Sequence, residues 1–415
     1  MPPLHLMFKT VSTCNLECGY CYYSQPLAGR QRSWRIEPEL LQKFIPYYMD
    51  YVADSHQANL SWQGGEPTLA GIDYFREIVN LEARYAVPPT IISNAIQTNG
   101  LLIDDEWAEF FSAFKFLVGI SLDGPESMHD LERRDRTGHG SFKRVMAHID
   151  LLRKHNVDLN VLCVIGQHNI SRVSELMQFF HQERLDYLQF MPAMAFQATN
   201  PMNPPSYLVT AEQYGNFLIN LFNQWYQTGV PIVSIRIFNN LLQNILGKNN
   251  DSCIYSESCD MSLVVDQKGD VYPCDFYIHP LWKLGNIRET SLEGLVGNPI
   301  RTVFLQQKQA FSSECQNCKW VSICRGECPR NKLHRENLSD SNYFCTSYKL
   351  LLDHAYTRLT VLGKRLSKYQ LYMNNTVNLS ASELQPDTNC PCGSGALYKD
   401  CCGDPVLASS YLFQD

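Results

Sequence analysis

The sequence predicts an α/β protein, in which a partial or complete barrel of βα units precedes a cysteine-rich region and a small C-terminal module. Two features of the chain predict this architecture. Short, mostly apolar segments alternate with helical segments from residue 5 to about residue 191, as expected for buried parallel strands joined by helices. Fifteen of the 16 cysteines lie in close-spaced groups, which in a reducing compartment indicate metal sites.

The expected elements follow one another in a regular order. The expected strands are His5–Val11, Asn59–Gln63, Ile91–Gln97, Phe116–Ser121, Leu159–Ile165 and Tyr187–Met191. Helices are expected between them at residues 37–53, 72–85, 103–113, 140–154 and 170–183, and later at 211–228 and 346–370. Such repetition of strand and helix winds into a βα barrel.

The composition excludes several classes of protein. A chain of 415 residues can form two or three domains, and its 45% hydrophobic and 19% charged content is that of a globular protein. The net charge of −7 argues against a general nucleic-acid binder, which normally presents a basic face. No apolar run approaches the roughly 20 residues of a membrane helix, and the start MPPLHLMFKTVS lacks the features of a signal peptide. We therefore expect a cytoplasmic protein that binds neither nucleic acid nor membrane.

Three cysteines follow the first expected strand. Cys14, Cys18 and Cys21 form the pattern C-x3-C-x2-C in the run CNLECGYC. Three thiolates hold three irons of a [4Fe-4S] cube and leave the fourth iron open, whereas clusters that only carry electrons are usually bound by four cysteines. A zinc ion would need a fourth nearby ligand, and the next cysteine is Cys163. The pattern favours a cluster that binds a small molecule.

Polar and glycine-rich turns end the next expected strands. The turn GGEP at 64–67 directly follows Gln63, and glycine there lets the backbone approach a ligand closely. The runs QTNG at 97–100 and GISLDGP at 119–125 end the third and fourth strands, and Arg133 follows with a guanidinium suited to a carboxylate.

Together these motifs resemble the radical S-adenosylmethionine (radical SAM) enzymes. The resemblance implies a partial (β/α)6 TIM-type barrel, a SAM-binding cluster on the three N-terminal cysteines, and a substrate held at the barrel mouth. The implied contacts to SAM are Tyr23, Gly65, Ser121, Arg133 and Met194. The implied substrate contacts are Gln63 and Tyr23. Arg134 and Arg136 are alternatives to Arg133, and Met194 could equally be a core residue.

A second group of eight cysteines lies between residues 253 and 345, enough for two complete four-cysteine sites. Spacing alone would also allow two zinc sites. With the upstream motif, the group resembles the SPASM extension of radical SAM enzymes, which carries two auxiliary [4Fe-4S] clusters and brings the expected total to three. The resemblance assigns Cys253, Cys259, Cys274 and Cys328 to the first auxiliary cluster. It assigns Cys315, Cys318, Cys324 and Cys345 to the second.

Asp275 directly follows the cluster cysteine Cys274. This position resembles that of the general base in the anaerobic sulfatase-maturating enzymes. Membership would imply oxidation of a cysteine or serine of a sulfatase to Cα-formylglycine, after a 5′-deoxyadenosyl radical removes a hydrogen atom from Cβ. The implied partners are a peptide or unfolded protein substrate and a flavodoxin- or ferredoxin-type electron donor, and a monomer is expected.

Two other functions remain open at this point. The chain could be a radical SAM/SPASM maturase that forms thioether, ether or carbon–carbon cross-links in a ribosomally made peptide. It could also be an electron-transfer or metal-storage protein, although the open-coordinate cysteine triad, the GGEP turn and Asp275 argue against this.

The C-terminal module contains four cysteines in 13 residues, with the pattern C-x-C-x8-C-C. Cys390, Cys392, Cys401 and Cys402 could hold a structural Zn²⁺. The module resembles the SEC-C motif, and it could either dock unfolded substrate or only stabilise the tail. The expected domains are a barrel at 1–210, a helical linker at 211–252, the SPASM domain at 253–370, a linker at 371–389 and the zinc module at 390–415.

Overall fold

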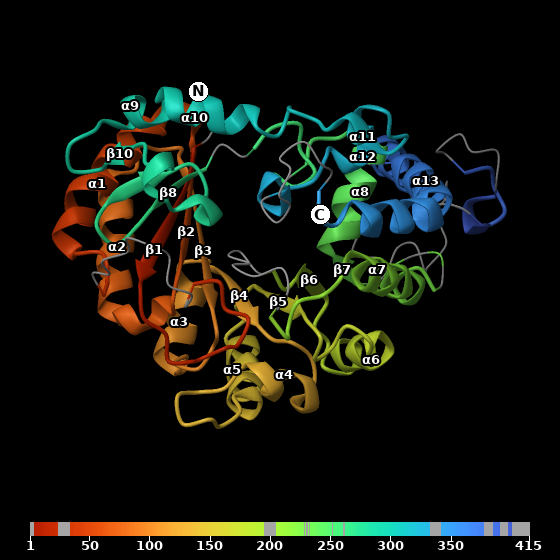
Figure 1. Ribbon diagram of the computed structural model, residues 1–415, viewed down its shortest axis with the longest axis horizontal. Helices are drawn as coiled ribbons and strands as arrows, with labels where there is room; N and C mark the ends of the chain where they lie inside the picture. The colour runs from red at the N-terminus through yellow and green to blue at the C-terminus, as the bar shows by residue number, and fades with distance from the viewer. Residues whose placement is uncertain are drawn as a thin grey trace. The chain divides into compact units, whose positions relative to one another are not determined.

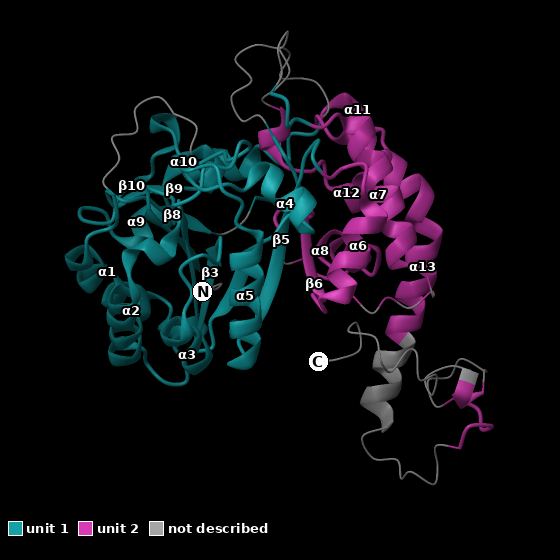
Figure 2. Ribbon diagram, turned by 90° about the horizontal axis from the view of Figure 1, so that it is seen from below, with its two compact units in different colours: residues 1–168, 191–208, 257–311 teal, residues 169–190, 209–256, 312–415 magenta. Residues whose placement is uncertain are grey.

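The chain folds into two compact units (Figure 2). A computed structural model describes residues 4–23, 34–194, 205–227, 229, 231, 233–250, 252–259, 262–332, 342–376, 385–390 and 397–400. The first unit comprises residues 1–168, 191–208 and 257–311, and the second comprises residues 169–190, 209–256 and 312–415. None of the described helices is both long enough and apolar enough to span a membrane.

A largely parallel sheet forms the centre of the first unit, with strand order β10-β9-β8-β1-β2-β3-β4-β5. Its first five strands are β1 (His5–Val11), β2 (Gln57–Gly64), β3 (Ile91–Thr98), β4 (Leu117–Ser121) and β5 (Leu159–Ile165). Each of these strands pairs in parallel with the next, with Phe8 opposite Trp62 and Trp62 opposite Ile96. Because parallel neighbours run the same way, the loops that follow these strands gather at one edge of the sheet.

Three short strands extend the sheet beyond β1. They are β8 (Leu263–Val265), β9 (Asp270–Tyr272) and β10 (Gly285–Asn286). Strand β8 pairs in parallel with β1 on the side opposite β2, placing Val265 across from Phe8. Strand β9 returns antiparallel to β8, and β10 is antiparallel to β9. Strand β8, which begins more than 250 residues after β1, is thus hydrogen-bonded directly to it.

Helices follow the strands of this unit, and Figure 1 shows α1, α2 and α3 on one side of β1, β2 and β3. The helices are α1 (Pro38–Tyr51), α2 (Ile72–Tyr85), α3 (Asp105–Ala113), α4 (Glu126–Glu132), α5 (Phe142–Lys154), α9 (Leu292–Val296) and α10 (Pro299–Gln306). Local sequence sets their starts: Asp104 caps α3 by accepting from the backbone N–H of Trp107 at 3.0 Å. Beneath α1 and α2, Phe8 stacks on Trp62 with ring centroids 4.7 Å apart, and Phe75 meets Trp62 edge-on.

The second unit is mainly helical. Its elements are α6 (Val173–Gln182), β6 (Tyr187–Pro192), α7 (Ala211–Trp225), β7 (Ser234–Ile235), α8 (Arg236–Ile245), α11 (Ser313–Gln316), α12 (Val321–Cys324) and α13 (Cys345–Thr376). The last two residues of β6 fall within the first unit. Helix α7 packs closely on α13 at Gly215. A Cβ added at this glycine would lie only 3.0 Å from the Cα of Ser347.

The alternating order of strands and helices predicted up to residue 191 is confirmed. The strands His5–Val11 and Leu159–Ile165 have the predicted bounds, and the other four differ by one or two residues at their ends. The hairpin strands β8–β10 were not predicted, because runs of two or three residues carry no periodic pattern and are stabilised by pairing with distant strands.

Candidate active site

The N-terminal cysteines lie in the loop that follows β1. The side-chain amide of Asn99, just after β3, donates to the Cys14 Sγ at 3.6 Å, and the backbone N–H of Leu16 donates to it at 3.4 Å. Burial raises the pKa of the Cys14 thiol to about 11 and that of the Cys18 thiol to about 12. Thiolates in such a site need a positive partner, and iron would supply one.

The GGEP turn is fitted against this loop by contacts that only glycine allows. The backbone N–H of Gly65 donates to the Val11 carbonyl at 2.7 Å. A Cβ at Gly65 would lie 2.0 Å from the carbonyl oxygen of Thr13, the residue before Cys14. Gly64 has φ +134°, in the region that favours glycine. The two glycines therefore fix the backbone that presents the first cluster cysteine.

Glu66 joins the ends of β2 and β3, a role that the sequence did not predict. Its buried carboxylate accepts from the Thr98 hydroxyl at 2.8 Å and from the Asn99 backbone N–H at 2.8 Å. It also accepts from the backbone N–H of Thr68 at 3.0 Å. Because Asn99 in turn contacts Cys14, the GGEP turn and the cysteine loop form one continuous hydrogen-bonded structure.

One predicted set of four cysteines is gathered in the structure. Within the described part of the chain, no three His, Cys, Asp or Glu side chains converge closely enough to hold one metal ion. A [4Fe-4S] cube binds each thiolate through a different iron atom, so its ligands lie farther apart than those of a single zinc ion. Cys315, Cys318, Cys324 and Cys345, predicted to hold the second auxiliary cluster, line one cavity of the second unit.

The four cysteines predicted for the first auxiliary cluster are divided between the two compact units, and those of the C-terminal module are described only in part. Cys253 and Cys328 belong to the second unit, where the pKa of Cys328 is raised to about 12 mainly by burial. Cys259 and Cys274 belong to the first unit. At the C-terminus, Cys390 is buried, whereas Cys392, Cys401 and Cys402 lie outside the described residues.

A buried ion pair lies beside the cysteine loop. The Nε and Nη2 of Arg133 donate to the two oxygens of Asp123 at 2.9 and 3.3 Å. The Tyr20 hydroxyl also donates to Asp123, and the guanidinium lies 5.4 Å from the centre of the Tyr20 ring. Burial opposes ionisation of Asp123, but the Arg133 guanidinium holds the pKa of its carboxyl below the usual value. Arg133 thus remains charged and fixed in place.

Two further predicted SAM contacts, Ser121 and Met194, lie at the ends of different strands. Ser121, at the end of β4, accepts from the Gln97 amide at 3.2 Å. Met194 is buried after β6. Arg136 donates to the Cys14 carbonyl at 3.0 Å, and Arg134 donates to the Asp130 carbonyl at 2.7 Å. Of the three arginines, only Arg133 is buried.

Asp275 follows β9 and belongs to a compact polar network. Its Oδ2 lies 3.3 Å from the Lys9 ammonium, which is 1% exposed, and accepts from the Tyr22 hydroxyl at 3.1 Å. Lys9 also donates to the Gln63 Oε1 at 3.3 Å, and the two residues sit opposite each other in the β1–β2 register. On the other side, the Cys274 Sγ lies 3.7 Å from the Asp275 Oδ1.

Two tyrosines from the cysteine loop complete this network. Burial, and then the Asp275 charge, raise the pKa of Tyr22 well above its usual value, so its hydroxyl stays protonated and donates to Asp275. The Tyr23 hydroxyl and the Gln267 amide are joined at 2.6 Å, and the same amide donates to the Lys9 carbonyl at 2.6 Å. The structure therefore brings together the predicted residues Gln63, Tyr23 and Asp275.

Lys9 and Tyr22 were not predicted as site residues. The available signal was a lysine in the apolar run of β1, since a charged side chain is rarely fully buried unless paired. Its partner lies 266 residues away in the sequence and could not be identified from the pattern.

Comparisons with known proteins show which family the chain resembles. The model of the Radical SAM superfamily matches residues 8–180, that of the SPASM iron-sulfur cluster-binding domain matches 253–319, and that of the SEC-C motif matches 389–404. The chain is 36% identical to a cysteine-type anaerobic sulfatase-maturating enzyme of Clostridium perfringens (strain 13 / Type A), covering 86% of this chain and 98% of the relative. It is 33% identical to a serine-type enzyme of Bacteroides thetaiotaomicron, covering 90% and 94% of the two chains.

A solved structure shows the same fold. Native anSMEcpe with bound AdoMet and Cp18Cys peptide superposes with a TM-score of 0.81 at 34% identity, covering 88% of this chain and 99% of that one. The radical SAM fold and the SPASM domain predicted from the cysteine patterns are therefore confirmed. With both curated relatives matched over nearly their whole length, the chain belongs to the anaerobic sulfatase-maturating enzymes of the radical SAM superfamily.

Proposed function

We propose that this enzyme oxidises the Cβ of a cysteine or serine in an unfolded sulfatase segment to Cα-formylglycine, with Asp275 as the general base. The observation that carries the assignment of the base is the pairing of Asp275 with Lys9 and Tyr22, next to the cluster cysteine Cys274. A base must lie within hydrogen-bond reach of the proton that it accepts, and this carboxylate is held at a defined place in the polar network.

The residues of the chain divide the work on the substrate. When bound, the open cluster on Cys14, Cys18 and Cys21 and SAM would supply the radical chemistry, and the auxiliary clusters would supply electron transfer. Lys9 and Tyr22 both bind Oδ2 of Asp275, so they fix the position of this oxygen. Oδ1 lies beside Cys274, whose thiolate would carry no proton when bound to iron, so Oδ1 can accept the S–H or O–H proton of the substrate.

The proton balance is the same for both substrate types. A cysteine side chain that loses a hydrogen atom from Cβ, a proton from sulfur and one further electron becomes a thioaldehyde, which water converts to the aldehyde and hydrogen sulfide. A serine side chain gives the aldehyde directly. The relatives named above include a cysteine-type and a serine-type enzyme, and a carboxylate base can serve both.

The cofactor contacts belong to the same proposal. Gly65, Ser121, Arg133 and Met194 would contact SAM around the cluster of Cys14, Cys18 and Cys21. Tyr23 and Gln63 would line the pocket for substrate beside it. We also propose two auxiliary [4Fe-4S] clusters with the cysteine sets given above, a flavodoxin- or ferredoxin-type reductant and a monomeric enzyme in the cytoplasm.

The C-terminal cysteines would hold Zn²⁺ in a module that docks unfolded substrate. Asn389 and Leu397 form an antiparallel bridge there, and the Lys399 ammonium lies 2.5 Å from Asp387. Deleting residues 384–415 should then reduce activity on a whole unfolded sulfatase and leave activity on a short peptide unchanged. Equal activity of the truncated and full-length enzymes on the whole sulfatase would contradict docking.

The test of the main proposal is an anaerobic assay with reconstituted enzyme, SAM, a reductant and a short peptide containing C-x-P-x-R. Mass spectrometry should detect conversion of the cysteine to formylglycine by the wild type. Asp275→Asn should still cleave SAM to deoxyadenosine but should leave the cysteine largely unconverted. A peptide that loses only two hydrogen atoms would instead indicate cross-linking, the alternative activity of related maturases.

A further inference from the structure

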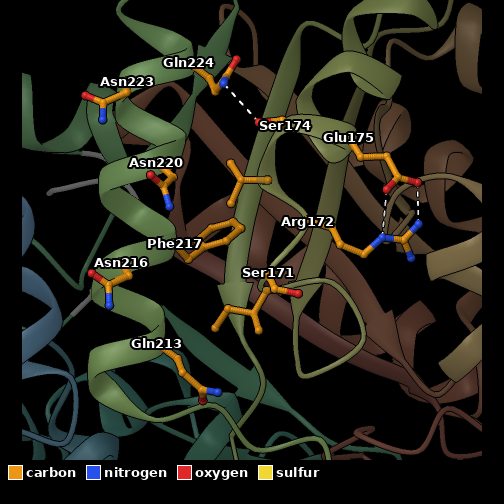
Figure 3. A pocket seen from close by; sticks show the side chains of 12 residues that line it. Ser171, Arg172, Ser174, Glu175, Gln213, Asn216, Phe217, Asn220, Asn223 and Gln224 are labelled. Carbon is orange, nitrogen blue, oxygen red and sulfur yellow. Dashed lines mark hydrogen bonds and ion pairs between the residues drawn. The ribbon is translucent and has the colours of Figure 1, made fainter.

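The second unit contains a groove, lined by polar and apolar side chains, that belongs to no part of the site described above. It has a volume of about 750 Å³ and lies between α7 and the first turn of α6 with the residues just before it (Figure 3). Every lining residue belongs to this unit. The groove is therefore a property of one compact body.

One wall of the groove is a row of amide side chains on α7. Figure 3 shows Asn216, Asn220 and Asn223 following one another along the helix. Their spacing of four and three residues places them on one helical face, and all three are exposed. Asn223 contacts His354 at 2.7 Å, whereas Asn216 and Asn220 form no side-chain hydrogen bond to any described residue. Asparagine is a poor helix former, so repeated use on one face requires another reason.

The opposite wall and the floor make the groove neutral and partly apolar. Arg172 and Glu175 form a two-contact ion pair at 2.9 and 2.5 Å, so their charges cancel. Ser174 accepts from the Gln224 amide at 3.3 Å across the groove. Buried Ile170, Val173 and Phe217 form the base. No net charge is present to select a phosphate or another charged ligand.

The chemistry of this lining matches an extended polypeptide main chain. Each amide offers a donor and an acceptor, as does each peptide unit of an extended chain. Asn216 and Asn220 are about 6 Å apart along the helix axis, roughly the length of two extended residues. We propose that the groove binds the main chain of the unfolded substrate at a stretch away from the modified residue, independently of its sequence. This inference rests on the proposed function, because it takes an unfolded polypeptide as the substrate.

The experiment uses Asn216→Ala/Asn220→Ala, which loses no internal side-chain hydrogen bond and raises helix propensity. Two substrates are compared: a long unfolded sulfatase segment, and a short peptide with only the motif and its neighbours. The expected result is a KM for the long segment raised about tenfold, consistent with the loss of a few hydrogen bonds, with kcat and the KM of the short peptide unchanged. Glu212→Ala, exposed on α7 but outside the groove lining, is the matched control and should behave as the wild type.

A binding measurement separates this inference from the proposed function. A fluorescently labelled long segment, with its target cysteine replaced by alanine, should bind the wild-type holoenzyme more tightly than the double variant even if no formylglycine forms. Equal affinity, or an equal rise in KM for both substrates, would overturn the inference. So would a neutral oligosaccharide whose binding alone is lost in the double variant, because the groove would then be a glycan site.

Discussion

The Lys9 ammonium lies 3.3 Å from the Asp275 carboxylate, although the two residues are separated by 266 positions in the sequence. Lys9 comes from β1 and Asp275 follows β9, and β8 connects these strands within one sheet. The proposed base is therefore paired with a residue of the strand that leads into the cluster loop. This arrangement couples the position of the base to the barrel core.

Replacing Lys9 by methionine should separate SAM cleavage from substrate oxidation. Methionine keeps most of the volume but removes the charge that pairs with Asp275, so we expect formylglycine formation to fall about 10- to 100-fold. Deoxyadenosine should still form, since Cys14, Cys18 and Cys21 are unchanged. The measurement is the ratio of formylglycine to deoxyadenosine per turnover. Lys43→Met, an exposed position on α1, is the control, and an unchanged ratio in Lys9→Met would contradict a role for Lys9.

Adding one methyl group at Gly65 should impair assembly of the N-terminal cluster. The new Cβ would lie 2.0 Å from the Thr13 carbonyl, so the backbone before Cys14 must shift. We expect Gly65→Ala to lose at least half of its SAM-cleaving activity and to bind less iron after reconstitution. Gly71→Ala is the matched control, because φ is +88° there but no atom lies within 4 Å of the added Cβ. Equal iron content in the two variants would contradict the argument from close backbone contact.

The Asp123–Arg133 pair should show strong coupling in a double-variant cycle. Removing one partner of a buried pair leaves an uncompensated charge, at a cost of about 3–5 kcal/mol. Burial lowers the pKa of the adjacent His129 to about 3, so this side chain stays neutral and cannot replace Arg133 as a cation. Arg133→Met and Asp123→Asn should each lower the melting temperature clearly. The loss of melting temperature in the double variant should be much smaller than the sum of the two single losses. Additive losses would show that the pair contributes no mutual stabilisation.

Glu82 on α2 should make stability depend on pH. Burial raises the pKa of its carboxyl to about 8 from the unfolded value of 4.5, opposed only by a 2.8 Å hydrogen bond from Asn94. The folded state therefore favours the protonated acid, and this stabilising contribution is lost as the pH rises from about 4.5 through about 8. Relative to Glu82→Gln, the wild type should lose about 3 kcal/mol of unfolding free energy between pH 5 and pH 8. Denaturation of both proteins at several pH values measures this difference, and parallel curves would contradict a raised pKa.

Much of the fold could be predicted because its signals are local. The first five strands of the barrel follow from apolar runs such as Leu159–Ile165, and α2 has the predicted bounds of residues 72–85. The hairpin of β8 and β9 carried no comparable signal, since its strands have only three residues and depend on pairing with β1.

The candidate site was predictable only where a motif marks it. Cys14, Gly65 and Asp275 stand in short patterns with a chemical reason. The structure places Cys14 and Gly65 after the neighbouring strands β1 and β2, and Asp275 after β9. Lys9 and Glu66 act through partners that the fold supplies, Asp275 for the first and Asn99 for the second. A buried charge can be noticed in a sequence, but the partner that makes its burial tolerable is defined only by tertiary structure.

The parallel pairing of β8 with β1 determines where this enzyme could be recombined with a relative. A chimaera joined at Cys253 would replace β8, β9 and β10 together with the rest of the C-terminal half. Strand β1 would then depend on a foreign strand for the hydrogen bonds of one edge, and Lys9 would meet an aspartate from another protein. A junction placed after residue 311 keeps the hairpin with its own barrel, since residues 257–311 belong to the same compact unit as β1. Exchange of substrate preference between family members should therefore succeed more often with the later junction.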